Sequence, residues 1–322
     1  MISSSLLKKL ALESGFSLAG VARARPLDSR PLDLWLAAGR HASMQWLEET
    51  RAVRTDPRLL LPGAKTVLAL AACYMTEGHS LDSPVAPYAQ GRDYHAVMKD
   101  KLRSLRRRLE ACGVKVPCFG TCDTVPIHEK AWAVLGGLGW LGKSCLLVTP
   151  GHGTRVVLGA LILGDEADAF DEPMAPRCGD CTRCLDACPT GALLGDGTLD
   201  AEKCLAFQTV ENAGRPFPEA LRSAARGTVF GCDICQRVCP WNRPKHACGD
   251  PKFAPRPLAF RTLDEWAEVS PEDFEAWTRG SALKRAGLSG IRRNARAALG
   301  MAEADEGDAE RPASVDRPGF SH

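Results

Sequence analysis

Long apolar runs are absent from this chain of 322 residues. No stretch approaches the roughly 18 consecutive apolar residues that a membrane-spanning helix needs. The first segment, MISSSLLKKLALESGFSLAG, places Lys8 and Lys9 inside an amphipathic pattern and lacks the apolar centre of a secretory signal peptide. The sequence therefore argues against membrane insertion and against export. It predicts a cytoplasmic protein with no membrane partner, and we expect a monomer.

The chain has 14 cysteines, which would suggest disulfides only in an exported protein. In the cytoplasm, clustered cysteines more often bind metal or carry out redox chemistry. Seven of them lie in two short motifs, CGDCTRCLDACP from Cys178 and GCDICQRVCP from Gly231, and Cys204 lies between the motifs. Together they make two sets of four possible metal ligands.

The first motif has the C-x2-C-x2-C-x3-C-P spacing of bacterial ferredoxins, in which three thiolates bind one 4Fe–4S cluster and the fourth binds a second cluster. A structural zinc site would favour two C-x2-C pairs and has no use for the final C-P corner. We therefore predict two 4Fe–4S clusters. The predicted ligands are Cys178, Cys181, Cys184 and Cys239 for one cluster, and Cys188, Cys204, Cys232 and Cys235 for the other.

Hydrophobic patterning divides the chain into four parts. Residues 66–72 read as a buried strand, residues 93–112 as an amphipathic helix, and residues 144–163 as two strands joined in a hairpin. This mixture with an antiparallel pair predicts an α+β fold. The expected parts are an α+β domain (1–170), a two-cluster ferredoxin-like domain (171–250), a short helical C-terminal segment (251–300) and a disordered tail (301–322).

Acidic residues are missing from residues 279–300, RGSALKRAGLSGIRRNARAALG. A solvated helix normally mixes charges of both signs, so an acid-free basic stretch favours contact with phosphates. The alternative is a basic surface helix with no partner. The candidate phosphate contacts are Lys284, Arg285, Arg292, Arg293 and Arg296.

Several stretches resemble the epoxyqueuosine reductase family: RTDPRLLLPGAKTVLALA, YAQGRDYH, CDTVPIHEKAWAVLGGLGWLGKS and the two cysteine motifs. The resemblance implies an enzyme related to reductive dehalogenases, with a nitroreductase-like first domain, cobalamin and two 4Fe–4S clusters. It implies reduction of the epoxide of epoxyqueuosine, at the wobble position of tRNA, to the alkene of queuosine. Electrons would come from an unidentified low-potential donor.

The resemblance also implies roles for individual residues. Asp123 corresponds to the proposed proton donor, and the expected cobalamin contacts are Arg54, Asp123, Leu147, Leu158 and Asp233. A carboxyl that donates a proton near neutral pH needs a raised pKa, which we expect from burial beside the corrin. The alternative is that Asp123 only caps the helix that begins near Pro126.

Other motif positions bear on the cofactor. A D-x-H-x-x-G signature for a histidine cobalt ligand is only half present, as Asp93-Tyr94-His95, which agrees with base-off cobalamin without such a ligand. Gly139 and Gly142 would let backbone approach the ring. Pro87 stands where the family often has arginine, so any contact made by that arginine must be absent or supplied elsewhere.

Two other functions remain to be compared. A reductive dehalogenase acting on a small halogenated molecule is disfavoured by the missing export signal and by the basic stretch. A non-catalytic electron-transfer ferredoxin is disfavoured because about 170 residues before the clusters would have no role.

Overall fold

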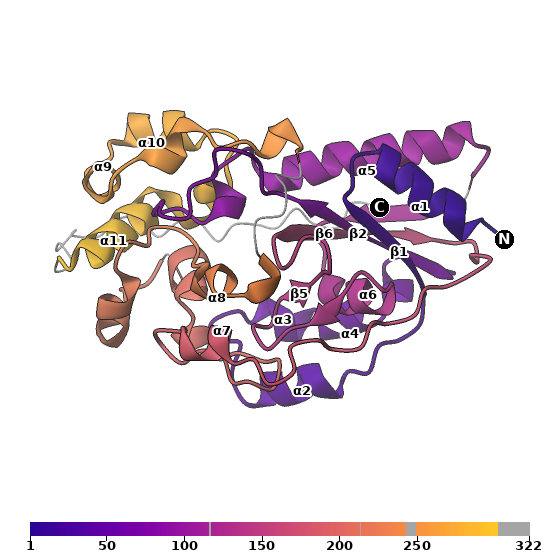
Figure 1. Ribbon diagram of the computed structural model, residues 1–322, viewed down its shortest axis with the longest axis horizontal. Coiled ribbons are helices and arrows are strands. Elements are labelled where there is room, and N and C mark those ends of the chain that lie inside the picture. The colour runs from indigo at the N-terminus through magenta and orange to yellow at the C-terminus, as the bar shows by residue number, and fades with distance from the viewer. Residues whose placement is uncertain (116, 213, 243–248, 302–322) are drawn as a thin grey trace.

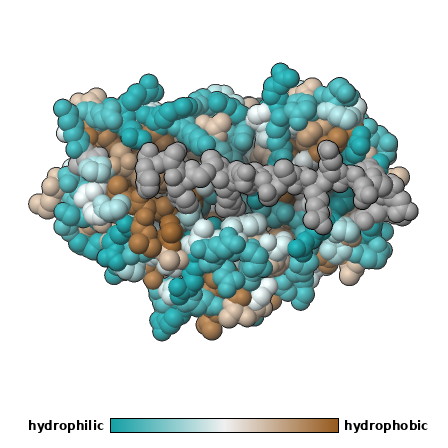
Figure 2. Space-filling view, turned by 180° about the vertical axis from the view of Figure 1, so that it is seen from behind, coloured by the Kyte–Doolittle hydropathy of each residue, from teal (hydrophilic) through white to brown (hydrophobic). Residues whose placement is uncertain are grey.

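The computed structural model describes residues 1–301 with the exception of residues 116, 213 and 243–248. The tail predicted at 301–322 therefore lies, apart from its first residue, outside the described residues. Within the described part, no helix is long and apolar enough to cross a membrane. The face shown in Figure 2 is largely hydrophilic, with hydrophobic side chains gathered in a patch left of centre.

The first half is built on a four-stranded antiparallel sheet with the strand order β1-β2-β6-β3. Its strands are β1 (Leu18–Arg23), β2 (Thr66–Cys73), β3 (Cys118–Thr121) and β6 (Val156–Leu163). Every residue of β2 is buried because the sheet is covered on both faces. The expected α+β class is confirmed at this level, with sheet and helices combined in one layered unit.

Helices cover the sheet from two sides (Figure 1). On one face α1 and α5 pack through a core that includes Leu7, Met98 and Leu105. On the other face α6 packs through Trp132, which is fully buried. The bounds are α1 (Ser4–Glu13), α2 (Arg30–Ala37), α3 (Trp46–Glu49), α4 (Arg51–Thr55), α5 (Tyr94–Ala111) and α6 (Glu129–Leu135).

The predicted hairpin at residues 144–163 is wrong. Its first strand, β5 (Leu147–Val148), pairs with β4 (Trp140–Leu141) in a separate small sheet, whereas β6 pairs with β2 and β3. The reason lies in Gly139, where a Cβ atom would come within 2.0 Å of the Val148 carbonyl oxygen. The glycine-rich segment before β4 thus packs directly against β5. As a result β5 pairs with β4 and not with β6, as the predicted hairpin would require.

The second half consists of short helices and turns. The two cysteine motifs form α7 (Arg183–Asp186) and α8 (Ile234–Arg237), which pack against each other. They are followed by α9 (Leu263–Ala267), α10 (Pro271–Thr278) and α11 (Gly287–Leu299). Ser270 caps α10 by accepting a hydrogen bond from the Asp273 amide. The helices predicted after residue 258 are therefore confirmed, and they enclose a core of their own around Trp266 and Ile291.

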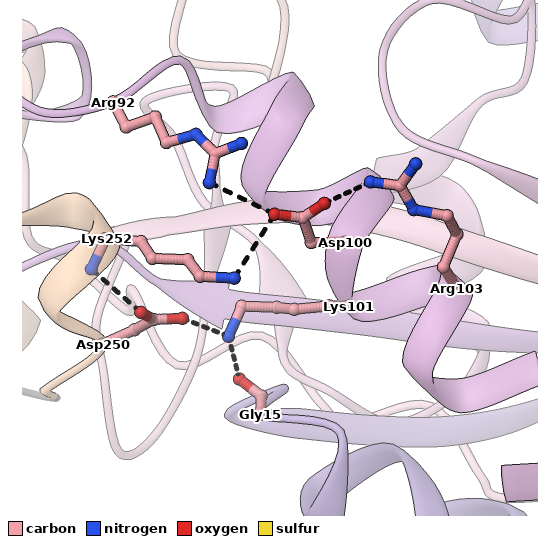
Figure 3. Close-up of polar contacts among 7 residues, drawn as sticks. All are labelled: Gly15, Arg92, Asp100, Lys101, Arg103, Asp250 and Lys252. Carbon is pink, nitrogen blue, oxygen red and sulfur yellow. Dashed lines mark hydrogen bonds and ion pairs between the residues drawn. The ribbon is translucent and has the colours of Figure 1, made fainter. Parts of the chain in front are cut away.

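A buried lysine joins the two halves (Figure 3). Only 6% of the Lys101 side chain is exposed; its Nζ donates to the Gly15 carbonyl oxygen at 2.6 Å and forms an ion pair with Asp250. A buried ammonium is tolerated only when it is paired and hydrogen-bonded. Lys101 meets that condition, and so it ties α5 to the chain that follows the cysteine motifs.

Candidate active site and cysteine clusters

Asp123 lies in the loop between β3 and α6 and has a left-handed backbone conformation, with φ of 57°. This conformation costs a residue other than glycine on the order of 1–3 kcal/mol and persists only when its surroundings hold it. One such contact is local: the Asp123 amide donates to Oε1 of Glu129 at 2.5 Å. The loop is thus tethered to the first residue of α6.

The carboxylate of Asp123 points to the start of α5. The Tyr94 hydroxyl donates to Oδ2 of Asp123 at 2.6 Å, and Nε2 of His95 lies 3.0 Å from the same oxygen. The other ring nitrogen of His95, Nδ1, lies 2.7 Å from Oδ1 of Asp93. Asp93 also accepts from the His95 amide and so caps α5. Four side chains therefore form one connected network.

This network reverses the expected pKa of Asp123. Burial by itself raises the pKa, but hydrogen bonds from His95 and Tyr94, together with the charge of His95, lower it to about 2. The side chain keeps 58% of its surface accessible, so water weakens these contacts without reversing their direction. Burial by the chain's own residues therefore does not hold this carboxyl protonated near neutral pH, and the raised pKa expected from burial beside the corrin stays a prediction.

The proton is instead held on His95. Burial by itself lowers the pKa of His95, but the hydrogen bonds and charges of Asp123 and Asp93 outweigh it and raise the pKa to about 9. At neutral pH the pair is therefore an imidazolium beside a carboxylate.

The helix-cap interpretation of Asp123 is wrong as well. The residue before α6 is His128, and no side chain caps this helix. The Asp123 carboxylate contacts the start of a different helix, α5. Its partners Tyr94 and His95 were not recognised as such from the sequence, although they lie in the Asp-Tyr-His stretch that the half-matched cobalt signature singles out.

Glu129 lies close enough to the Asp123 loop and to Arg54 to be affected by the charges of both. Burial, and the nearby charge of Asp123, raise the pKa of Glu129 to about 7 in spite of the opposing charges of Arg54 and Lys130. Arg54 comes from α4, where its Nε donates to the Thr50 hydroxyl at 2.9 Å. Sequence reasoning missed Glu129, because nothing in the stretch HEK distinguishes its carboxylate from a surface residue.

The predicted apolar contacts differ in how much surface they offer. Leu147 is only 3% exposed and belongs to a core cluster with Ala133 and Leu138. Leu158, on β6, is half-buried and packs against the same cluster. Leu158 therefore has side-chain surface left for a ligand, whereas Leu147 has little beyond its backbone.

Asp233 lies within the second cysteine motif, between Cys232 and Cys235. It accepts a hydrogen bond from Nε2 of Gln236 at 2.7 Å, and burial raises its pKa to about 6. Its charge in turn contributes to the raised pKa of Tyr88, after the larger effect of burial. The Tyr88 ring contacts the Tyr94 ring edge-on at 5.9 Å. The Tyr88 ring thus lies between Phe230, which directly precedes the second cysteine motif, and the Tyr94 ring of the Asp123 network.

Pro87 occupies the position where the family often has arginine, next to Tyr88. It is buried and begins a 3-10 turn, Pro87–Ala89, which places Tyr88 against Phe230 as well as Tyr94. Its carbonyl oxygen lies 3.1 Å from Nε2 of His79.

The cysteine thiols lie in two neighbourhoods. Burial raises the pKa of Cys239, and the adjacent thiols of Cys178 and Cys181 raise it further. Burial likewise raises the pKa of Cys232 to about 11, with Cys204 among the contributing neighbours. Most of the thiols that act on one another belong to the same predicted ligand set, but Cys184 of the first set also acts on Cys235 of the second.

Among the residues that the structure describes, no three His, Cys, Asp or Glu side chains converge closely enough to hold a single metal ion. A 4Fe–4S cluster makes a different demand, because each thiolate binds a separate iron at a corner of the cube. Four sulfurs around a cluster therefore need not meet at one point. The cluster ligands remain a prediction.

The basic stretch separates into two groups. Arg292 donates to the Val269 carbonyl oxygen at 2.8 Å, and Arg293 donates to the Asn212 carbonyl oxygen at 2.6 Å while lying over the ring of Phe217. These two guanidinium groups hold the helical segment together. Phosphate contact through them is therefore poorly supported.

Of the other candidates, Lys284 and Arg285 are exposed, whereas the Arg296 side chain is only 18% exposed. Arg285 pairs with Glu211 at 2.5 Å, and its charge helps His95 and Tyr94 to lower the pKa of Asp123 against the opposing effect of burial. It therefore borders the candidate active site. Lys284 pairs with Glu275 at 2.6 Å, and Arg296 lies 3.9 Å from Glu268.

Comparison with known proteins now adds to this geometry. Residues 54–124 match a family model described as epoxyqueuosine reductase QueG, and residues 177–242 match a 4Fe-4S double cluster binding domain. The chain is 42% identical over 305 residues to the epoxyqueuosine reductase of Gloeobacter violaceus, covering 91% of this chain and 95% of the relative. The chain belongs to the epoxyqueuosine reductase family.

Other members agree with this assignment. The epoxyqueuosine reductase of Cellulophaga algicola is 36% identical over 296 residues, which cover 90% of this chain and 96% of the relative. Among solved structures, an epoxyqueuosine reductase with an epoxyqueuosine-modified tRNA stem loop superposes with a TM-score of 0.83 at 30% identity, over 92% of this chain and 80% of the other. A Bacillus subtilis structure, described with its catalytic aspartate loop swung out of the active site, has a TM-score of 0.81 at 29% identity over the same shares. Family members are oxidoreductases.

Proposed function

We propose that this protein reduces the epoxide of epoxyqueuosine, at the wobble position of tRNA, to the alkene of queuosine. The observation that carries the proposal is the network of Asp123, His95 and Tyr94 at the edge of the sheet, close to Arg285 and linked through Tyr88 to the cysteine motifs. His95 and Asp123 form a pair that can transfer a proton. Arg285 supplies a positive charge nearby, and the Tyr88 ring lies between this network and the cysteines that would hold the electron carriers. In a relative with this fold, the bound molecule is an epoxyqueuosine-modified tRNA stem loop.

In this proposal, each predicted part of the chain has its own role. A nitroreductase-like domain (1–170) holds the active site, a ferredoxin-like domain (171–250) carries electrons, and the helices of 251–300 contribute to tRNA binding. The eight cysteines named above would hold two 4Fe–4S clusters, which pass electrons inward from a low-potential donor. We propose that a cytoplasmic monomer is sufficient, since these parts lie in one chain.

Base-off cobalamin is the cofactor that we propose for the first domain, where it would supply a strong cobalt nucleophile and reductant. Arg54, Asp123, Leu158, the Leu147 backbone and Asp233 are the residues that we propose would contact it. His95 is available as hydrogen-bonding partner to Asp93 and Asp123 but not to cobalt, because both of its ring nitrogens are already engaged. This arrangement fits a cofactor bound without a histidine ligand from this network.

The chain's own residues supply protons. Conversion of an epoxide to an alkene and water consumes two electrons and two protons, and alkoxide is a poor leaving group unless it is protonated. In the free protein His95 carries the proton and Asp123 is the acceptor beside it. We propose that Asp123 receives the proton from His95 and passes it to the departing oxygen, while Tyr94 holds the carboxylate in position. The second proton, which completes the water, would come from solvent.

The loop that carries Asp123 is expected to move during the cycle. In the Bacillus subtilis relative, the corresponding loop is swung out of the active site. We propose that the inward position seen here is the reactive one, since it joins Asp123 to Tyr94 and His95. An outward position would admit or release the modified base.

The test is anaerobic turnover. Protein reconstituted with iron, sulfide and cobalamin is chemically reduced and mixed with tRNA that carries epoxyqueuosine, and queuosine is measured by nucleoside analysis. Asp123→Asn keeps the shape but cannot donate a proton of useful acidity, so we expect a rate loss of about 10²–10⁴-fold with clusters and cobalamin retained. Asp82→Asn, on an exposed loop, is the matched control. Wild-type turnover by Asp123→Asn would exclude Asp123 as the proton donor, and no queuosine from the wild type would exclude the function.

A further inference from the structure

We propose that Glu129 is a positioning residue that latches the Asp123 loop in its inward position. The inference rests on the proposed function, in which Asp123 takes part in the reaction. The contact that carries it is the hydrogen bond from the Asp123 amide to Oε1 of Glu129 at 2.5 Å. This bond acts on the backbone of the loop and not on its carboxylate, so it is separate from the network with Tyr94 and His95.

Glu129 belongs to a helix that is packed firmly on the sheet. Glu129 is the first residue of α6, and α6 packs on the sheet through Trp132 and Ala133, which are 0% and 1% exposed. Within the loop, Asp123 and Thr124 are exposed, whereas Cys122 before them and Ile127 after them are buried. A hydrogen bond from this exposed part of the loop to a packed helix restrains it, since only one partner has to be ordered.

The latch also offsets backbone strain at a defined residue. Asp123 has a φ of 57°, a conformation that must be over-determined by its surroundings. Tyr94 and His95 hold its carboxylate from α5, and Glu129 holds its amide from α6. The residue is thus pinned from two helices that lie on opposite faces of the sheet. Loss of one restraint leaves the strained conformation supported from one side only.

The surroundings of Glu129 keep its carboxyl directed at the loop. Arg54 from α4 and Lys130 from α6 are the nearby cations, and Asp123 is the nearby acid. Lys130 is itself occupied, because its Nζ donates to the Cys145 carbonyl oxygen at 2.8 Å. The Asp123 amide is therefore the hydrogen-bond donor that the structure places on Oε1 of Glu129.

Hydrogen exchange tests the latch directly and without cofactor or substrate. The exchange rate of the Asp123 amide is measured at single-residue resolution in wild-type protein, Glu129→Ala and Glu129→Gln, with Glu110→Ala on the exposed end of α5 as the control. Ala removes the acceptor, whereas Gln retains a carbonyl oxygen at the same place. The measurement is made above pH 8, where Glu129 with its pKa of about 7 is ionised, and the loss of a hydrogen bond to that carboxylate should speed exchange by about 10–100-fold. We expect that increase in Glu129→Ala, a smaller one in Glu129→Gln, and none in the control.

Turnover gives the second measurement. Single-turnover formation of queuosine should fall at least about tenfold in Glu129→Ala and recover to within a few fold of wild type in Glu129→Gln, with equal thermal melting and equal tRNA affinity. Unchanged exchange of the Asp123 amide in a folded Glu129→Ala variant would overturn the latch, whatever happens to turnover. Faster exchange with unchanged turnover would also overturn it. The Asp123→Asn test bears on the proposed function alone, because the amide that Glu129 binds is still present in that variant.

Discussion

Replacement of His95 by glutamine should move the pH profile of the reaction. In the folded protein the pKa of His95 is raised to about 9, so the pair with Asp123 keeps its proton as the pH rises from 6 to beyond 8. Wild-type rates should therefore be nearly flat up to about pH 8 and fall above about pH 9. Glutamine can still donate a hydrogen bond to Asp123 but carries no proton of useful acidity.

The expected size of the effect follows from the protonated fraction. A group with a pKa of about 9 is roughly 90% protonated at pH 8, whereas a carboxyl with an ordinary pKa of about 4 retains about one proton in 10⁴. Without the histidine, burial pulls the pKa of Asp123 upward, which reduces the loss somewhat. We expect the rate at pH 8 to fall by about 10³-fold, and the deficit to shrink by up to tenfold for each unit by which the pH is lowered.

The assay should isolate the proton-dependent step. Enzyme that is already chemically reduced is mixed anaerobically with a limiting amount of tRNA between pH 6 and 9.5, and queuosine is quantified in single turnovers. His152→Gln is the matched control, since His152 is a half-buried turn histidine outside the network. If the His95→Gln profile has the same shape as the wild-type profile, His95 is not the source of the proton.

Three further outcomes are expected. Cys204→Ala should leave roughly half of the iron that wild-type protein binds per chain, because Cys204 is a predicted ligand of only one cluster. Wild-type protein that contains two zinc ions and no iron would exclude the two clusters. Lys101→Met should destabilise the protein by about 3 kcal/mol in chemical denaturation, because it leaves an aspartate unpaired at a largely buried site, whereas the exposed Lys99→Met should change stability by less than about 0.5 kcal/mol. Arg285→Ala should weaken tRNA binding and reduce its salt slope by about one, and an unchanged slope would place the phosphate contacts elsewhere.

The sequence predicted the features that depend on short spacings. The cysteine motifs, the helix of 93–112 and the strand of 66–72 are each encoded by residues within about 20 positions, and the last two are confirmed by α5 and β2. The hairpin at 144–163 failed because pairing depends on which segment lies nearest in space. The backbone of Gly139 packs closely against the carbonyl oxygen of Val148. Such a close contact between two segments cannot be predicted from the alternation of apolar residues along the chain.

For the basic stretch of residues 279–300, too, the sequence predicted one property and the structure decided another. Its lack of acids is a property of the sequence, and it suggested five equivalent phosphate contacts. In the structure, Arg292 and Arg293 bind backbone carbonyl oxygens, whereas Arg285 borders the active site. Charge alone could not separate them, because the acceptors of the first two come from segments some 20 to 80 residues away.

For the candidate active site, the sequence by itself identified Asp123 through its motif and the eight cysteines through their spacing. The tertiary structure decided the chemical state of those groups. The pKa of a carboxyl is set by what lies within a few ångströms of it, and for Asp123 those neighbours are Tyr94 and His95, almost 30 positions earlier in the chain. They lower the pKa of Asp123, whereas burial raises that of Glu129. Residue type and spacing determine which groups are present, but only folding brings together the charges and donors that determine where the proton resides.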